Sequence, residues 1–516
     1  MRSRIITLLA IVLTTACGEL NDPASITGVD GLSGVKTTKP LPAMTMSCLQ
    51  QTRAAVMTLL FDGVLTEAEV NPLLNRLDVV IRQVERDHER PASNVADSYN
   101  YEVQKYVESG RLTAEQASTI MMSFECIAPV AIAAGESHNC VLLSDNSVWC
   151  WGSNSNGQLG IGSTSNSSVP VRVAGLSAQK LEAGGFNTCV LTSGQPWCWG
   201  RNEWGQLGNG SMAANSTTPI AVSWPISDAV EQLSVGWALA CARVANGETY
   251  CWGQNSSGGV GSPATTDMCS GQFCARTPVR ISTTRTYTDV DVGIQGGCAI
   301  GSDGLAYCWG SRSFGALGDG VQVARCTIAG VLRSQCASEP TLVAGDNHFK
   351  KIQFGAQYVC AIRADDQAMC WGSNDGGELG VGSLQPGNAF SPLSVVGEQT
   401  FASLSAVDGI ELTAHVCGLN AAGDALCWGW NKDGQLGAAN KDCAFNGVAS
   451  PCATSPQAVS GLKFKQVAVG RGHSCGITAD NRVLCWGANA MGQLGDGSTS
   501  PHGAPAPVVA SWSDTP

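Results

Sequence analysis

The chain has 516 residues, enough to bury a large core, and its 44% hydrophobic and 14% charged content is typical of a folded globular protein rather than of disorder. Its formal net charge of −12 argues against a nucleic-acid partner, because a surface that follows phosphates needs clustered lysine and arginine, and no such cluster is visible. Its 61 glycines suit an architecture of many short strands joined by corners.

The N-terminus has the pattern of an export signal. Arg2 and Arg4 precede an apolar segment, residues 5–13, that is too short to span a bilayer. The segment Thr14–Cys17 then resembles a bacterial lipoprotein box, although Thr14 stands where that pattern prefers leucine. We therefore expect residues 1–17 to be a signal peptide that ends at a lipidated Cys17, with ordinary cleavage and a secreted product as the alternative.

This lipid would be the only contact with a membrane, at the bacterial cell envelope. Gly18 rather than an acidic residue follows the cysteine, which favours the outer membrane over the inner one. Residues 18–42 are rich in glycine, serine, threonine and proline and have no apolar period, as expected of a flexible tether.

Residues 43–126 change character, with few glycines and a helical period of apolar residues. The segments Thr66–Glu69 and Thr113–Gln116 each have the pattern of a capping box, which predicts a helix start. A helix capped by Asn71 with Pro72 in its first turn is the alternative start for the first of these. The sequence predicts a small α-helical domain, whose function it does not reveal.

Residues 127–510 consist of seven copies of one unit, of which Cys140–Trp151 is the clearest. A cysteine is followed by apolar residues, a polar turn, a short apolar run and Cys-Trp-Gly, and shortly afterwards by a Gly-x-x-Gly corner such as Gly157–Gly160. The tryptophans that end the copies are Trp151, Trp199, Trp252, Trp309, Trp371, Trp428 and Trp486. A period of this size indicates an array of supersecondary units, and seven units can close a ring.

Each unit is predicted to be a β-hairpin with its two cysteines opposite each other. A non-hydrogen-bonded antiparallel pair has Cα atoms about 4.5 Å apart, near the lower end of what a disulfide accepts. Seven hairpin disulfides are therefore expected: Cys140–Cys150, Cys189–Cys198, Cys241–Cys251, Cys298–Cys308, Cys360–Cys370, Cys417–Cys427 and Cys475–Cys485.

The remaining cysteines also form pairs by proximity. Of 23 cysteines, 22 remain if Cys17 carries lipid. The further expected pairs are Cys269–Cys274, Cys326–Cys336, Cys443–Cys452, and Cys48–Cys126 around the helical domain. Complete pairing suits an oxidising, extracytoplasmic compartment.

The frame AAGESHNCVLLSDNSVWCWGSNSNGQLGIGS, which begins at Ala133, resembles the repeat of the regulator of chromosome condensation family. That pattern is roughly a-G-x-x-H-s-x-a-L followed by v-y-x-W-G-x-N-x-x-G-Q-L-G, and the resemblance covers about residues 127–510. It implies an all-β fold, a seven-bladed β-propeller of four-stranded blades, here with the small N-terminal α-helical domain. The paired cysteines and the predicted export set the chain apart from the better-known eukaryotic members, so none of their exchange-factor or chromatin-binding residues is carried over.

No catalytic, cofactor-binding or metal site is expected. His138, His415 and His473 occupy one repeat position, two residues before the first hairpin cysteine, and are therefore interpreted as packing residues. The other units place Asn187, Leu239, Gly296 and Tyr358 there. Carboxylates from different blades could still meet over the central channel, which leaves an extracytoplasmic enzyme acting on carbohydrate or peptide as an alternative.

Four units carry longer excursions after the Gly-x-x-Gly corner: Ser262–Thr277, Asp319–Glu339, Val381–Ser391 and Ala438–Ser455. Because all four leave the same place in the repeat, they should emerge on one face of the ring. Three contain a cysteine pair, which lowers the entropy lost on binding. The apolar residues predicted to bind a partner are Met268, Phe273, Val331, Leu332, Phe390 and Phe445.

We therefore expect an exported, lipid-anchored propeller that binds a protein or peptide and catalyses no reaction. The resemblance permits an inhibitor or an adaptor, since related secreted bacterial propellers include protein inhibitors of β-lactamase. Tolerated surface insertions on a structural envelope protein are the second alternative. The segment APAPVVASW, which begins at Ala504, is a candidate for the strand that closes the ring, and residues 511–516 are expected to form a tail.

Overall fold

The computed structural model describes residues 46–509, with gaps at 85–88, 114–115, 118–119, 121–126, 212–214, 282, 407–412, 439–440 and 446–447. The predicted signal peptide with Cys17, the tether 18–42, the tail 511–516, and the side chains of Cys48 and Cys126 lie outside this description. The chain divides into two compact units between Ala128 and Pro129.

The N-terminal unit is helical and contains α2 (Met46–Phe61), α3 (Glu67–Val84) and α4 (Glu89–Glu108). The predicted capping box at Thr113 has both of its reciprocal hydrogen bonds, and the one at Thr66 has the bond from the Thr66 N–H to Glu69. The Thr66 N–H donates to Glu69 Oε2 at 2.7 Å, and the Thr113 N–H donates to Gln116 Oε1 at 2.9 Å. The alternative start at Asn71 is wrong, because α3 begins at Glu67 and Pro72 lies inside it. None of the helices in the described part of the chain is long and apolar enough to cross a membrane.

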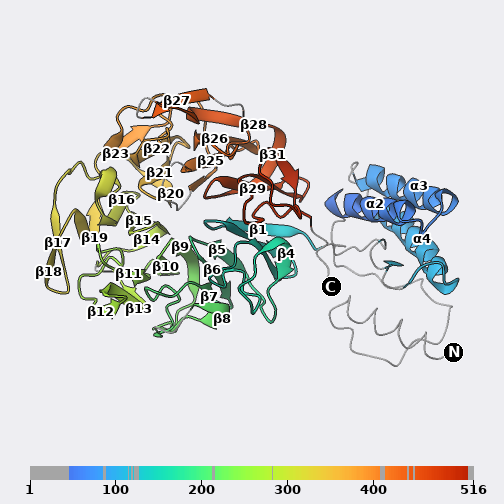
Figure 1. Ribbon diagram of the computed structural model, residues 1–516, viewed down its shortest axis with the longest axis horizontal. Helices are drawn as coiled ribbons and strands as arrows, with labels where there is room; N and C mark the ends of the chain where they lie inside the picture. Colours follow the sequence, from blue (N-terminus) through green and yellow to red (C-terminus); the bar gives the residue numbers. More distant parts are fainter. Residues whose placement is uncertain are drawn as a thin grey trace. The chain divides into compact units, whose positions relative to one another are not determined.

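The second unit is a seven-bladed β-propeller, the ring in Figure 1. Within the described residues each blade contains four antiparallel strands in sequence order, and the insertion of blade 3 adds a fifth strand to its sheet. The strands of the first three blades are β1 (Pro129–Ala134), β2 (His138–Leu143), β3 (Val148–Gly152), β4 (Ser167–Arg172); β5 (Lys180–Ala183), β6 (Asn187–Thr192), β7 (Gln195–Gly200), β8 (Ser216–Ala221); and β9 (Val230–Val235), β10 (Leu239–Val244), β11 (Thr249–Gln254), β13 (Gln272–Arg280).

The last four blades repeat this order. Their strands are β14 (Tyr287–Val292), β15 (Gly296–Gly301), β16 (Ala306–Ser311), β19 (Cys336–Leu342); β20 (Phe349–Phe354), β21 (Tyr358–Arg363), β22 (Ala368–Ser373), β23 (Asn388–Ser394); β24 (Ser403–Ala406), β25 (His415–Leu419), β26 (Asp424–Trp430), the first part of β28 (Val448–Gly470); and the second part of β28, β29 (His473–Thr478), β30 (Val483–Gly487), β31 (His502–Pro507). The long strand β28 thus joins blade 6 to blade 7.

The ring closes by contact between blades 7 and 1. The C-terminal strand β31 pairs with β30 as the outer strand of blade 7, so the candidate closing segment completes that blade instead of joining blade 1. Across the junction, Gln466 accepts from the Ile132 N–H at 3.1 Å and donates to the Ile132 carbonyl at 2.9 Å.

The tryptophan of each Cys-Trp-Gly fastens its blade to the preceding one. Its ring is fully buried, and its Nε1–H donates to a backbone carbonyl of the preceding blade's Gly-x-x-Gly corner at 2.8–3.1 Å. The second glycine of that corner lies against the indole at φ 62–72°, where a Cβ would come within 2.6–3.1 Å of it. The two signatures of the repeat are therefore the two halves of one contact between blades, which we call the blade clasp.

All seven expected hairpin disulfides are present, with Cα–Cα distances of 4.0–4.1 Å and the two cysteines directly opposite in register. The insertions contain Cys269–Cys274, Cys326–Cys336 and Cys443–Cys452. These ten disulfides among the described cysteines indicate an oxidising environment.

Candidate functional site

The three histidines of the repeat connect neighbouring blades. All are fully buried, and each Nε2 lies within hydrogen-bond distance of a polar side chain on the next blade: His138 at 2.9 Å from Thr188, His415 at 2.7 Å from Ser474, and His473 at 3.1 Å from Asn139. Burial lowers the pKa to about 3 for His138 and His473 and to about 4 for His415, so the rings are neutral near pH 7. Among the described residues no group of three His, Cys, Asp or Glu could hold a metal ion.

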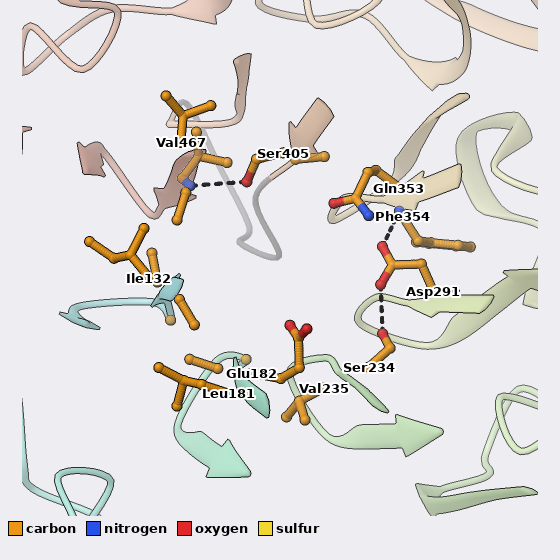
Figure 2. Close-up of a pocket in the computed structure, with 18 of the residues that line it drawn as sticks. Ile132, Leu181, Glu182, Ser234, Val235, Asp291, Gln353, Phe354, Ser405 and Val467 are labelled. Carbon is orange, nitrogen blue, oxygen red and sulfur yellow. Dashed lines mark hydrogen bonds between the residues drawn. The ribbon is translucent and has the colours of Figure 1, made fainter. Parts of the chain in front are cut away.

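The central channel contains a cavity of about 240 Å³, lined by the first strand of every blade. One register position, directly opposite the first hairpin cysteine, recurs around it. Its occupants are Ala133, Glu182, Ser234, Asp291, Gln353, Ser405 and Ala468. Figure 2 shows several of these residues arranged around the open centre of the ring. The position lies seven residues before that cysteine in six of the units, so an alignment of the repeats on their cysteines would have found it.

Two carboxyl groups at this position come from blades 2 and 4, as the enzyme alternative requires. Asp291, however, accepts from the Ser234 hydroxyl at 2.6 Å and from the Phe354 N–H at 2.7 Å, which ties blade 4 to blades 3 and 5. Burial raises the pKa of Asp291 to about 7. Because its two oxygens already bind neighbouring blades, Asp291 is placed to hold the ring together rather than to react with a substrate.

Glu182 differs from Asp291 in having no hydrogen-bond partner among the described residues. Its carboxyl group points into the channel in Figure 2. Its side chain reaches the solvent of the channel but is surrounded by the channel wall, and this enclosure, followed by the charge of Asp291, raises its pKa to about 8. Glu182 is therefore the carboxyl group of this position that no hydrogen bond ties to a neighbouring blade among the described residues.

The insertions lie in the connections between the third and fourth strands of their blades. Strand β12 (Asp267–Cys269) extends the sheet of blade 3 beyond β13, β17 (Arg325–Ile328) and β18 (Val331–Ser334) form a separate hairpin, and β27 (Lys441–Phe445) pairs with β28. Figure 1 shows all three at the outer circumference of the ring. The sequence did not anticipate this position, because spacing shows where an insertion leaves the repeat but not whether it bends inward or outward.

Successive insertions contact one another. The Ala329 N–H of blade 4 donates to the Pro263 carbonyl of blade 3 at 2.9 Å, and the Arg333 guanidinium lies 5.5 Å from the centre of the Phe273 ring. The Gly320 N–H donates to the Phe390 carbonyl of blade 5 at 2.7 Å. Blades 3, 4 and 5 therefore share one continuous outer surface.

The predicted partner-binding residues differ in exposure. Met268 is 49%, Val331 43% and Leu332 58% exposed, whereas Phe273 and Phe390 are half-buried. The side chain of Phe445 lies outside the described residues. We call Met268, Phe273, Val331 and Leu332 the rim patch. The sequence missed Val323, which is 76% exposed in the same insertion as Leu332; its alternation with Val321 in Val-Gln-Val was the available signal.

Comparison with known proteins agrees with this architecture. A family model for the RCC1-like domain matches residues 176–514, and models of the regulator of chromosome condensation (RCC1) repeat match residues 130–158 and 145–191. The ultraviolet-B receptor UVR8 of Arabidopsis thaliana is 26% identical over 73% of this chain and 81% of its own length. The human probable E3 ubiquitin-protein ligase HERC6 is 28% identical over 42% of this chain, which is only 20% of that protein.

Solved structures show the same fold. The structure of Kap60 bound to yeast RCC1 (Prp20) matches 70% of this chain and 84% of the matched chain with a TM-score of 0.59 at 20% identity. Human WBSCR16 matches 70% of this chain and 94% of its own with a TM-score of 0.58 at 19% identity. The chain belongs to the regulator of chromosome condensation repeat family.

Proposed function

We propose that this protein is an exported, lipid-anchored propeller that binds a protein or peptide partner through its insertions and catalyses no reaction itself. The observation that carries the proposal is the rim patch, where apolar side chains are held exposed on hairpins closed by Cys269–Cys274 and Cys326–Cys336. Binding energy at protein interfaces concentrates in a few such anchors, and a hairpin already fixed by a disulfide loses little entropy on binding.

The relatives support a binding role. UVR8 is by name a receptor, and the yeast RCC1 structure contains Kap60 as a bound partner. For the present chain, the acids of the channel either hold neighbouring blades or stand alone, while the rim patch exposes apolar side chains. Binding without catalysis fits both features.

The test is partner capture by variants with matched controls. Replacing Met268 and Leu332 with serine should abolish capture of envelope proteins that the wild type retains. The control replaces Met491 and Val130, which are 45% and 55% exposed and lie in blades without insertions, with serine. Full capture by the rim-patch variant, with the control unchanged, would place the binding surface elsewhere on the protein.

The proposed export and anchoring are supported by the N-terminal sequence and by the disulfides of the propeller. Cys17→Ser should convert a detergent-partitioning protein into a soluble or unprocessed one. If the wild type partitions to the aqueous phase with an unmodified N-terminus, the predicted lipid anchor is wrong. The alternative of a secreted product then applies. In the proposed arrangement, residues 18–42 separate the anchor from the folded units, with the helical domain as a spacer.

A further inference from the structure

The β17–β18 hairpin of blade 4 is a small two-stranded sheet fixed in place by several restraints. Ala329 and Gly330 form its turn with φ of 48° and 77°, the two positive values of a type I′ turn. The Cys326–Cys336 disulfide closes its open end, and the Ala329 N–H donates to blade 3. The hairpin is therefore held as a fixed projection from the ring.

One edge of this sheet is unpaired. Strand β18 pairs with β17 alone among the described strands, and all four of its residues are exposed. The turn directs the Val331 N–H toward β17, so the N–H and C=O groups of Leu332 and Ser334 point away from the hairpin. Proteins usually protect such an edge with lysine, proline, a bulge or a covering segment. Strand β18 has no lysine or proline, and its one charged side chain, Arg333, is turned toward the Phe273 ring.

The two faces of the hairpin have different chemistry. Val331 and Arg333 lie on the face that contacts blade 3, beside the fully buried Ile328. Leu332 and Arg325 lie on the opposite face, because side chains alternate along a strand and Arg325 pairs in register with Ser334. Leu332 is the most exposed apolar residue of the hairpin, and Arg325 has no ion pair among the described residues. The strands of the hairpin therefore offer apolar and positively charged side chains, in a chain whose net charge is −12.

We propose that β18 accepts an extended segment of the partner as a third strand, and that this segment alternates apolar with acidic residues. This inference rests on the proposed function and names the kind of partner that the rim patch binds. Main-chain hydrogen bonds to Leu332 and Ser334 supply attachment, as in other cases of strand addition. The apolar side chains of the segment cover Leu332 on one face, while the acidic side chains that alternate with them meet Arg333 on the opposite face. The negative charge of the rest of the protein disfavours binding of the same segment elsewhere.

A synthetic peptide of alternating valine and glutamate is the probe, with alternating valine and lysine as the control, each titrated into the full-length protein by fluorescence anisotropy. The glutamate peptide should bind at least about tenfold more tightly than the lysine peptide, a difference of about 1.4 kcal/mol. Arg333→Glu should reduce or reverse this preference. Equal binding of the two peptides, or binding of neither at millimolar concentration, overturns the inference.

Amide hydrogen exchange distinguishes strand addition from side-chain docking. The glutamate peptide should slow exchange at Leu332 and Ser334 but leave Val331 and Arg333 unchanged, since these already face β17. Ser334→Pro removes one outward N–H without touching the β17–β18 pairing, and it should weaken peptide binding about tenfold, whereas Ser334→Ala should not. Retention of the Cys326–Cys336 disulfide in each variant shows that the hairpin has formed.

The outcome also separates this inference from the proposed function. If Met268→Ser with Leu332→Ser abolishes partner capture while Ser334→Pro leaves both capture and exchange protection intact, the rim patch binds its partner and strand addition is wrong. If capture survives the serine variants, the proposed function itself fails at this surface.

Discussion

The repeat hairpin of blade 4 and the insertion hairpin of the same blade carry disulfides of the same sequence separation, but the strands around them differ in exposure. Cys298–Cys308 and Cys326–Cys336 each join residues ten apart. The first lies inside a blade where both cysteines are fully buried and the neighbouring Trp309 completes a blade clasp. The second closes a hairpin whose outer strand, β18, is exposed at every residue.

A disulfide that closes a loop of the same length therefore has a different role in each of these hairpins. In the blades, the disulfide adds to a core that already holds the hairpin. At the rim, the disulfide, a few backbone hydrogen bonds and the buried Ile328 hold the hairpin, and this leaves Val331 and Leu332 exposed. Three predictions test this comparison.

Breaking a blade clasp should have the largest effect. Trp371→Ala removes a fully buried ring and its hydrogen bond to the Ala316 carbonyl, and should lower the free energy of unfolding by about 3–5 kcal/mol. Gly318→Ala should destabilise the same clasp from the side of the preceding blade, because the added Cβ would lie 2.6 Å from the Trp371 Nε1. Urea denaturation measures both, with Val323→Ala as an exposed control expected to change stability by less than about 0.5 kcal/mol. Equal losses for Trp371→Ala and the control would mean that the clasp does not stabilise the ring.

Removing the disulfide of either hairpin should lower the free energy of unfolding less than breaking a blade clasp does, and the two losses should differ. In the chain-entropy model each ten-residue loop contributes about 2–3 kcal/mol. Replacing Cys298 and Cys308 with alanine should cost at least this amount in global unfolding, since the blade opens only with the ring. Replacing Cys326 and Cys336 with serine should leave the global transition almost unchanged, because an exposed hairpin can open locally.

Proteolysis or hydrogen exchange would detect that local opening in β17 and β18. A loss of global stability as large as that of the blade variant would contradict the comparison, since it would show that the rim hairpin unfolds only with the ring.

The buried histidines should make the ring sensitive to acid. Their folded-state pKa values of about 3 to 4 lie below the usual 6.5, so the unfolded chain binds protons first as the pH falls. The stability that they contribute is present above pH 6.5 and is lost as the pH falls toward 4, by about 1.4 kcal/mol per histidine for each pH unit.

The histidine effect can be isolated with a residue that the repeat already accepts. Replacing His138, His415 and His473 with asparagine, which blade 2 has as Asn187 at the same position, should flatten the dependence of the urea midpoint on pH between 6.5 and 4. An unchanged slope would show that other groups determine acid unfolding. The rim hairpin contains no histidine, so partner binding should not follow this transition.

Much of the fold could be predicted because it depends on contacts between residues close in sequence. The two cysteines of a hairpin are nine or ten residues apart, so their spacing alone determines the register that joins them. The capping box at Thr66 and Glu69 is similarly local. The recurrence of Trp371 and its six equivalents marks the repeat, but the sequence could not identify the glycine corner of the preceding blade as the partner of the tryptophan.

The remaining features depend on how the ring closes. Asp291 binds Ser234 and Phe354, which are 57 and 63 residues away. An alignment of the repeats would place Ser234 and Asp291 at one repeat position, but it would not show that they bind each other. The exposure of Leu332 and Val323 likewise depends on the outward direction of the blade 4 insertion. The sequence by itself therefore determined the repeat, its hairpins and their disulfides, because hydrogen-bond register within a hairpin is a matter of spacing along the chain. Only the tertiary structure decided which residues meet in the channel and which edge is left unpaired at the rim, because those neighbours come from different blades.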